Sequence, residues 1–124
     1  MKTPYISIGA IFAFLAVALG AFGAHGLKGR IDPYLLEVYK TGVQYHLAHA
    51  LGLILLGVIV ELRGFDRAYR WSGIAMGTGI VLFSGSLYLM AVTGIRWLGM
   101  VTPIGGVLFL VAWALLATAA WRRH

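Results

Sequence analysis

Four long apolar stretches constrain this sequence more than any other feature. They run over about residues 5–24, 42–62, 71–93 and 97–121. A helix needs roughly 20 apolar residues to cross a hydrocarbon core of about 30 Å, and each stretch has that length. Since lipid offers the backbone no hydrogen-bond partners, each stretch is expected to be helical. The sequence therefore predicts an all-α fold, a four-helix transmembrane bundle that forms a single integral membrane domain over residues 1–124.

The composition supports a membrane location and excludes several other classes of protein. Hydrophobic residues make up 60% of the 124 residues, more apolar surface than a soluble domain of this size can bury. The ten Lys and Arg residues lie between apolar runs, so the net charge of +6 indicates bilayer anchoring and not nucleic-acid binding. The absence of cysteine excludes disulfides, thiolate catalysis and cysteine metal centres. The predicted partner is therefore the lipid bilayer.

The distribution of basic residues predicts the orientation. Four spans place both termini and the connection between the second and third spans on one side. That side carries six basic residues and the other side four: Lys2, Arg63, Arg67, Arg70, Arg122 and Arg123 against Lys28, Arg30, Lys40 and Arg96. By the positive-inside rule, both termini are expected in the cytoplasm.

The connection from residue 25 to residue 41 contains a helix start of its own. Asp32 is a good N-cap, Pro33 suits the first helical position, and Glu37 suits an early turn. We predict a short interfacial helix between the first two spans. The alternative is that the helix of the second span extends out of the membrane past Gly42.

Small residues recur at four-residue spacing in two of the spans. Ala16, Gly20 and Ala24 lie in the first span, and Gly73 and Gly77 lie in the third. Such stripes let helices approach closely, either within the bundle or in contacts with a second copy or a membrane-complex partner. A leucine at Gly20 or Gly77 is expected to force a neighbouring helix away.

The polar residues of the spans fall mainly in the leaflet opposite the termini. The candidate site residues are His25, Tyr45, His46, His49, Ser84, Ser86, Tyr88 and Thr102. They predict either a polar pocket open to the outer face, or a set of interhelical hydrogen bonds that fix the register of the helices.

The histidines raise the question of a metal or haem iron. His46 and His49 share a helix face, and His25 could approach them, which is a weak pattern for zinc, copper or haem. We predict no cofactor and no metal. Instead, His25 and His49 are expected to meet and to form hydrogen bonds with Ser84, Ser86, Tyr88, Thr102 or the Gly99 carbonyl.

The sequence lacks the residues that catalysis or proton-coupled transport requires. Glu61 lies at the end of the second span beside Arg63, and no carboxylate lies deeper in a span. There is no phosphate-binding glycine loop, nucleophile arrangement or carboxylate pair. We therefore predict that the protein is not an enzyme.

Four ordered motifs carry a resemblance to a known family. They are Gly20–Leu27, Tyr45–Leu51, Leu82–Tyr88, and Thr102–Gly106 ahead of Trp113. With them the chain resembles the YgdD and YwdK-like membrane proteins, the domain of unknown function 423 family that includes transmembrane protein 256. The resemblance implies four spans and an inner or plasma membrane location. The family has no established activity that could be inferred for this chain. The family pattern has glutamine at the position of His46, which leaves His25 and His49 as the histidines that match.

The sequence thus predicts a small multi-pass membrane protein of unknown biochemical function, acting as an accessory, packing or lipid-associated protein. Two alternatives remain. The first is small-molecule or lipid binding or transport through the outer polar pocket, and the second is a haem or metal protein that uses His25 and His49.

Overall fold

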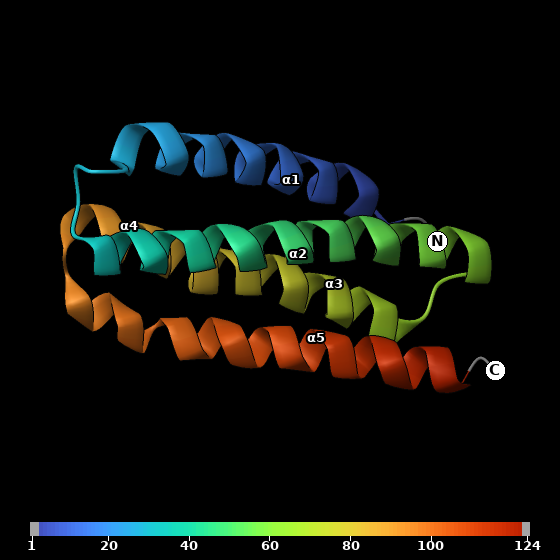
Figure 1. Ribbon diagram of the computed structural model, residues 1–124. Coiled ribbons are helices and arrows are strands. Elements are labelled where there is room, and N and C mark those ends of the chain that lie inside the picture. The colour runs from blue at the N-terminus through green and yellow to red at the C-terminus, as the bar shows by residue number, and fades with distance from the viewer. Residues whose placement is uncertain (1–2, 123–124) are drawn as a thin grey trace.

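The computed structural model describes residues 3–122 and is almost entirely helical (Figure 1). Four helical segments have the length and hydropathy of membrane spans, so the predicted all-α four-span bundle is confirmed. The elements in chain order are α1 (Tyr5–Phe22), the π-helical turn η1 (Gly23–Leu27), α2 (Pro33–Arg63), α3 (Arg67–Gly79), the π-helical turn η2 (Ile80–Ser84), α4 (Gly85–Thr93), the 3-10 turn η3 (Arg96–Met100) and α5 (Thr102–Arg122).

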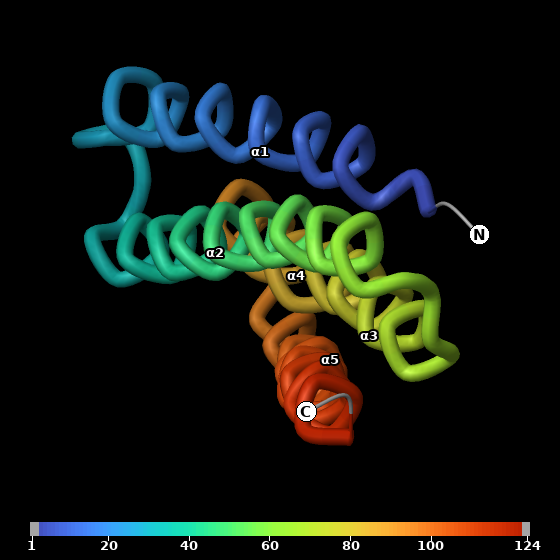
Figure 2. Tube along the Cα trace, turned by 90° about the vertical axis from the view of Figure 1, so that its right-hand side faces the viewer, coloured from blue at the N-terminus to red at the C-terminus, as the bar shows by residue number. Residues whose placement is uncertain are grey.

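The second span lies at the centre of the bundle. Helix α2 packs against α1 on one side and against α3, η2 and α4 on the other, while α5 packs mainly against α3 and η2. Figure 2 shows α1 and α5 on opposite sides of α2 and the third span. Helices α1 and α5 therefore expose most of their surface, which is apolar as lipid requires.

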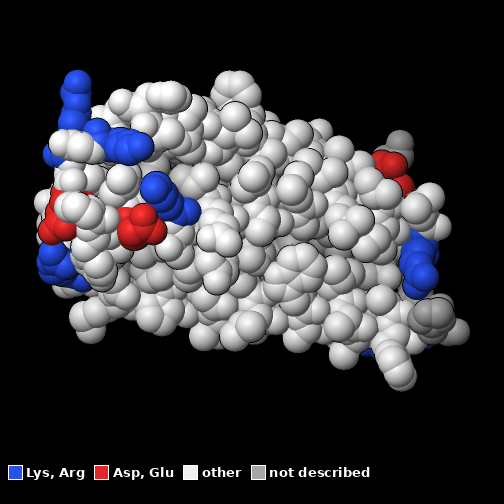
Figure 3. Space-filling view, in the orientation of Figure 1, with Lys and Arg blue, Asp and Glu red and all other residues white. Residues whose placement is uncertain are grey.

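The ends of the bundle carry the charges (Figure 3). On the face shown, Lys, Arg, Asp and Glu gather at the two ends and leave a broad uncharged belt between them. The start of α1 and the end of α5 lie at the same end (Figure 1). Lys2 and Arg123, on which the predicted basic excess depends, lie outside the described residues. Without them, each end carries four basic residues.

Helix α2 begins where the sequence predicts a helix start. The Asp32 carboxylate accepts a hydrogen bond from the Tyr34 backbone N–H at 2.9 Å, with Pro33 at the first helical position. The predicted separate interfacial helix is wrong, because α2 continues without a break to Arg63, as in the alternative. No proline interrupts the chain between Tyr34 and Arg63, so nothing ends the helix, and Gly42 is buried, where a methyl group would lie 2.9 Å from the Tyr88 ring.

The helix contacts depend on glycines that receive large side chains. The Phe109 ring covers Gly79, the Tyr5 ring covers Gly73, and in each case a Cβ atom would overlap the ring. Gly20 lies in a close contact, as predicted, because a methyl group there would be 3.2 Å from Val43. Gly77 is not in such a close contact, because a methyl group there would have only the Phe12 ring nearby, at 3.9 Å.

This difference predicts opposite effects of two matched substitutions. Gly73→Ala should displace the Tyr5 ring and lower the free energy of unfolding by about 1–3 kcal/mol, as overpacking does. Gly77→Ala should leave stability unchanged or raise it by up to ~1 kcal/mol, because alanine favours helix over glycine. Thermal unfolding in detergent would measure both effects. Equal melting temperatures for the two variants would contradict the assigned packing.

Candidate functional site

The structure distributes the predicted polar residues over separate pairs and does not gather them around one pocket. His46 is buried in α2, and its Nδ1 atom lies 2.8 Å from the Tyr88 hydroxyl of α4. The edge of its ring meets Phe12 of α1 at a centroid distance of 5.9 Å. Its Nε2 atom is buried and has no hydrogen-bond partner within residues 3–122. His46 therefore ties three spans together.

His49 has a hydrogen-bond partner at both ring nitrogens. Its Nδ1 atom lies 2.8 Å from the Tyr45 carbonyl, which can only accept, so Nδ1 carries the proton. Its Nε2 atom accepts a hydrogen bond from the Trp113 indole N–H at 2.9 Å. The ring also stacks on Phe109 with centroids 3.5 Å apart. His49 is thus a neutral imidazole whose remaining lone pair is occupied.

This geometry does not support the metal and haem alternative. A metal ion bound at His49 Nε2 would have to displace the indole N–H of Trp113. The prediction that His25 meets His49 is wrong, because His25 is exposed in η1 and His49 pairs with Trp113. Within residues 3–122 no three His, Asp or Glu side chains come together as a metal site would require.

The serines form short bonds between helices. Ser84 donates to the Gly42 carbonyl at 2.7 Å and so joins η2 to α2. The Ser86 hydroxyl lies 2.6 Å from that of Thr102 and also donates to the Phe83 carbonyl of its own span. These bonds correspond to the predicted interhelical network.

Besides the Trp113–His49 bond, the sequence did not predict three further polar contacts between helices. The fully buried Ser72 donates to the Ala112 carbonyl at 2.7 Å, in the half of the bundle nearer the termini. The hydroxyls of Tyr5 and Tyr39 donate to the carbonyls of Arg70 and Leu19. Ser72 lies away from the candidate site residues, in the opposite leaflet. A serine inside an apolar span is nevertheless itself a signal for such a bond.

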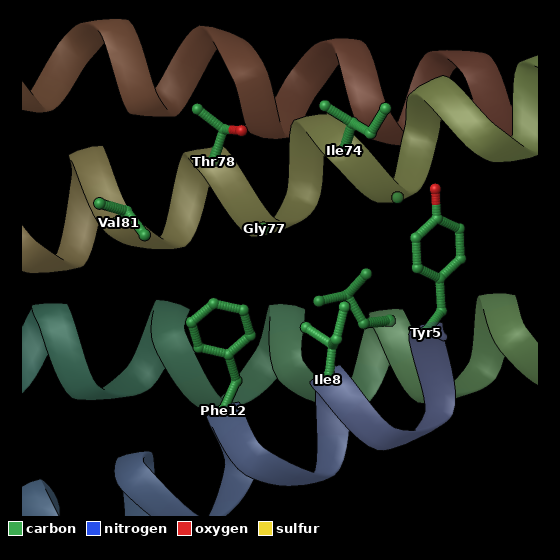
Figure 4. A pocket seen from close by; sticks show the side chains of 9 residues that line it. Tyr5, Ile8, Phe12, Ile74, Gly77, Thr78 and Val81 are labelled. Carbon is green, nitrogen blue, oxygen red and sulfur yellow. The ribbon is translucent and has the colours of Figure 1, made fainter. Parts of the chain in front are cut away.

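The larger hollows of the surface are apolar clefts between helices. The α1–α3 cleft has a volume of about 430 Å³ (Figure 4), and its lining consists of Tyr5, Ile8, Phe12, Leu53, Gly73, Ile74, Gly77, Thr78 and Val81. The α4–η3 cleft has a volume of about 440 Å³, and its lining consists of Val81, Leu82, Gly85, Ser86, Tyr88, Leu89, Leu98 and Val101. A hollow of about 270 Å³ borders Tyr45 and His49. The clefts therefore offer mainly carbon to a ligand.

The bond between Trp113 and His49 predicts a measurable coupling. Trp113→Phe removes the donor and leaves a buried acceptor unpaired, so stability should fall by about 1 kcal/mol. Trp97→Phe is the matched control, since Trp97 is exposed. A double-mutant cycle with His49→Leu should give a coupling energy of about 0.5–1.5 kcal/mol. A coupling near zero would contradict the bond, and a metal lost in the His49 variant would revive the metal alternative.

Comparison with known proteins gives one family and several close relatives. The family described as "Protein of unknown function (DUF423)" matches residues 19–106. The UPF0382 membrane protein YwdK of Bacillus subtilis (strain 168) is 50% identical over 116 residues, which cover 94% of each chain. UPF0382 membrane protein SAB0533 of Staphylococcus aureus (strain bovine RF122 / ET3-1) is 42% identical, covering 95% of each chain. No solved structure matches.

Proposed function

Since this chain belongs to the DUF423 family of unknown function, with relatives named as UPF0382 membrane proteins, we propose that it is a lipid-associated accessory protein of the cell membrane. It acts as a stable helical bundle whose side clefts hold lipid chains. In this proposal the polar residues hold the helices together, and the protein has no catalytic activity.

One observation carries the proposal: within residues 3–122 most buried polar side chains bond one another or the backbone, with His46 Nε2 and the Tyr69 hydroxyl as exceptions, while the open clefts are apolar. Within residues 3–122, the side chains of His49, Ser72, Ser84 and Ser86 all have hydrogen-bond partners. The α1–α3 and α4–η3 clefts lie between membrane-spanning helices, where lipid chains are the surrounding solvent. This arrangement suits binding of hydrocarbon better than binding of a polar solute.

The charge distribution argues against transport of ions or protons. No Asp, Glu, Lys or Arg occurs in residues 41–60, 71–95 or 97–121. Transporters and proton relays typically place such a residue inside the membrane, at the substrate or ion path. A passive, lipid-binding role requires no ionisable residue inside the membrane.

The orientation belongs to the same proposal. Counting Lys2 and Arg123, the end that holds the termini carries six basic residues against four, which favours a cytoplasmic location for that end. Reporter fusions at the C-terminus should therefore be active only with cytoplasmic reporters. Activity of a periplasmic or extracellular reporter at that position would reverse the orientation.

Lipid retention tests the proposed function. After purification in a mild detergent, phospholipid should remain bound in a defined ratio to protein, as measured by native mass spectrometry. Removing it with a harsher detergent should lower the melting temperature, and adding lipid should restore it, because binding to the folded state alone stabilises that state. A protein that retains no phospholipid and melts identically with and without added lipid would contradict the proposal.

A further inference from the structure

The α1–α3 cleft runs along the membrane normal from the end that holds the termini. One wall extends from Tyr5 to Phe12 of α1, and the other extends from Gly73 of α3 to Val81 of η2 (Figure 4). These segments rise about 10–12 Å at 1.5 Å per residue, which covers most of the depth of one leaflet. The cleft therefore has the direction of a lipid chain in that leaflet.

The size of the cleft favours a single chain over a helix. Two turns of helix with side chains, at least 10 Å across and ~11 Å long, occupy about 800 Å³ or more. The cleft offers about 430 Å³. Gly77 leaves its middle open, since a methyl group there would have only Phe12 nearby, at 3.9 Å. A flexible hydrocarbon chain can enter this space as a whole, whereas a partner helix could insert only the side chains of one face.

A basic side chain lies at the headgroup end of the cleft. Arg70 is exposed and precedes Gly73 and Ile74 by one turn of α3. The hydroxyl of Tyr5, which lines this end of the cleft, donates a hydrogen bond to the Arg70 carbonyl and so places Arg70 beside the cleft. Within residues 3–122 Arg70 forms no salt bridge, whereas Asp66 pairs with Arg122 at 3.2 Å. The Arg70 guanidinium is thus available to a phosphate.

From this arrangement we propose that the α1–α3 cleft binds one acyl chain of an anionic phospholipid, and that Arg70 binds its phosphate. The site lies in the leaflet on the side of the termini. This inference rests on the proposed lipid association and adds the site, the lipid class and the leaflet. The anionic class follows from charge, because a basic side chain near the surface favours anionic lipid by about 1 kcal/mol.

Native mass spectrometry of the full chain with added phosphatidylglycerol or phosphatidylcholine tests the inference. The parent should bind phosphatidylglycerol more tightly. Arg70→Gln should weaken that binding about fivefold, equivalent to ~1 kcal/mol, and Gly77→Leu, which fills the cleft, by at least the same factor. The matched controls are Lys28→Gln at the opposite end, which should bind as the parent does, and Gly85→Leu in the α4–η3 cleft, which should leave the preference for phosphatidylglycerol unchanged.

The outcomes separate the inference from the proposed function. If no variant or parent retains lipid, both fail. If lipid is retained but Arg70→Gln or Gly77→Leu leaves phosphatidylglycerol binding unchanged, the inference is overturned and lipid association stands. A dimer that Gly77→Leu abolishes would also overturn it, by placing a second copy in the cleft. Should Gly77→Leu fail to fold, Ile74→Phe on the exposed rim replaces it.

Discussion

The close approach of helix backbones at glycine is the constraint on which the rest of this bundle depends. In lipid, apolar burial gives little drive for helices to associate, so packing contacts decide whether they do. Two glycines allow this approach across one interface: the Phe109 ring of α5 covers Gly79, and the backbone and Cβ atom of Phe83 lie against Gly105 of α5. The same arrangement joins α4 to α2, where Tyr88 lies against Gly42. Each ring fills space that a Cβ atom would occupy.

The polar bonds are a consequence of that close approach. A serine side chain is short, so Ser84 reaches the Gly42 carbonyl only because the two backbones are close. The Ser72 hydroxyl reaches the Ala112 carbonyl of α5 in the same way. Such bonds contribute about 0.6–2 kcal/mol each in membranes, but they are directional, so they also fix the rotation and register of the helices. Packing and hydrogen bonding therefore select the same arrangement.

Sequence spacing predicted the features that depend on a single helix. It did not predict the contacts that depend on which residue of a neighbouring helix lies opposite. The spans and the Asp32 cap follow from local properties of the chain, and both are present. The close contact at Gly42 involves Tyr88, a residue of another helix, which the sequence of α2 does not identify. Likewise, the four-residue spacing of Gly73 and Gly77 gives no information about which one faces the Tyr5 ring.

The same limit of sequence spacing applies to the candidate site. Depth along the spans predicted that the outer polar residues lie at similar levels, and several do form bonds there. Depth does not give the angular position of a side chain around its helix. The sequence therefore predicted the wrong partners for His49 and did not identify Trp113.

The length of α2 also bears on how the bundle sits in the bilayer. Its 31 residues span about 46 Å against a hydrocarbon thickness of about 30 Å. The excess lies mainly in residues 33–41, which precede the apolar stretch and carry Glu37 and Lys40. Because Tyr39 and Gly42 hold these outer turns to neighbouring helices, the packed bundle continues past the hydrocarbon on that side and ends in the interface as one rigid unit.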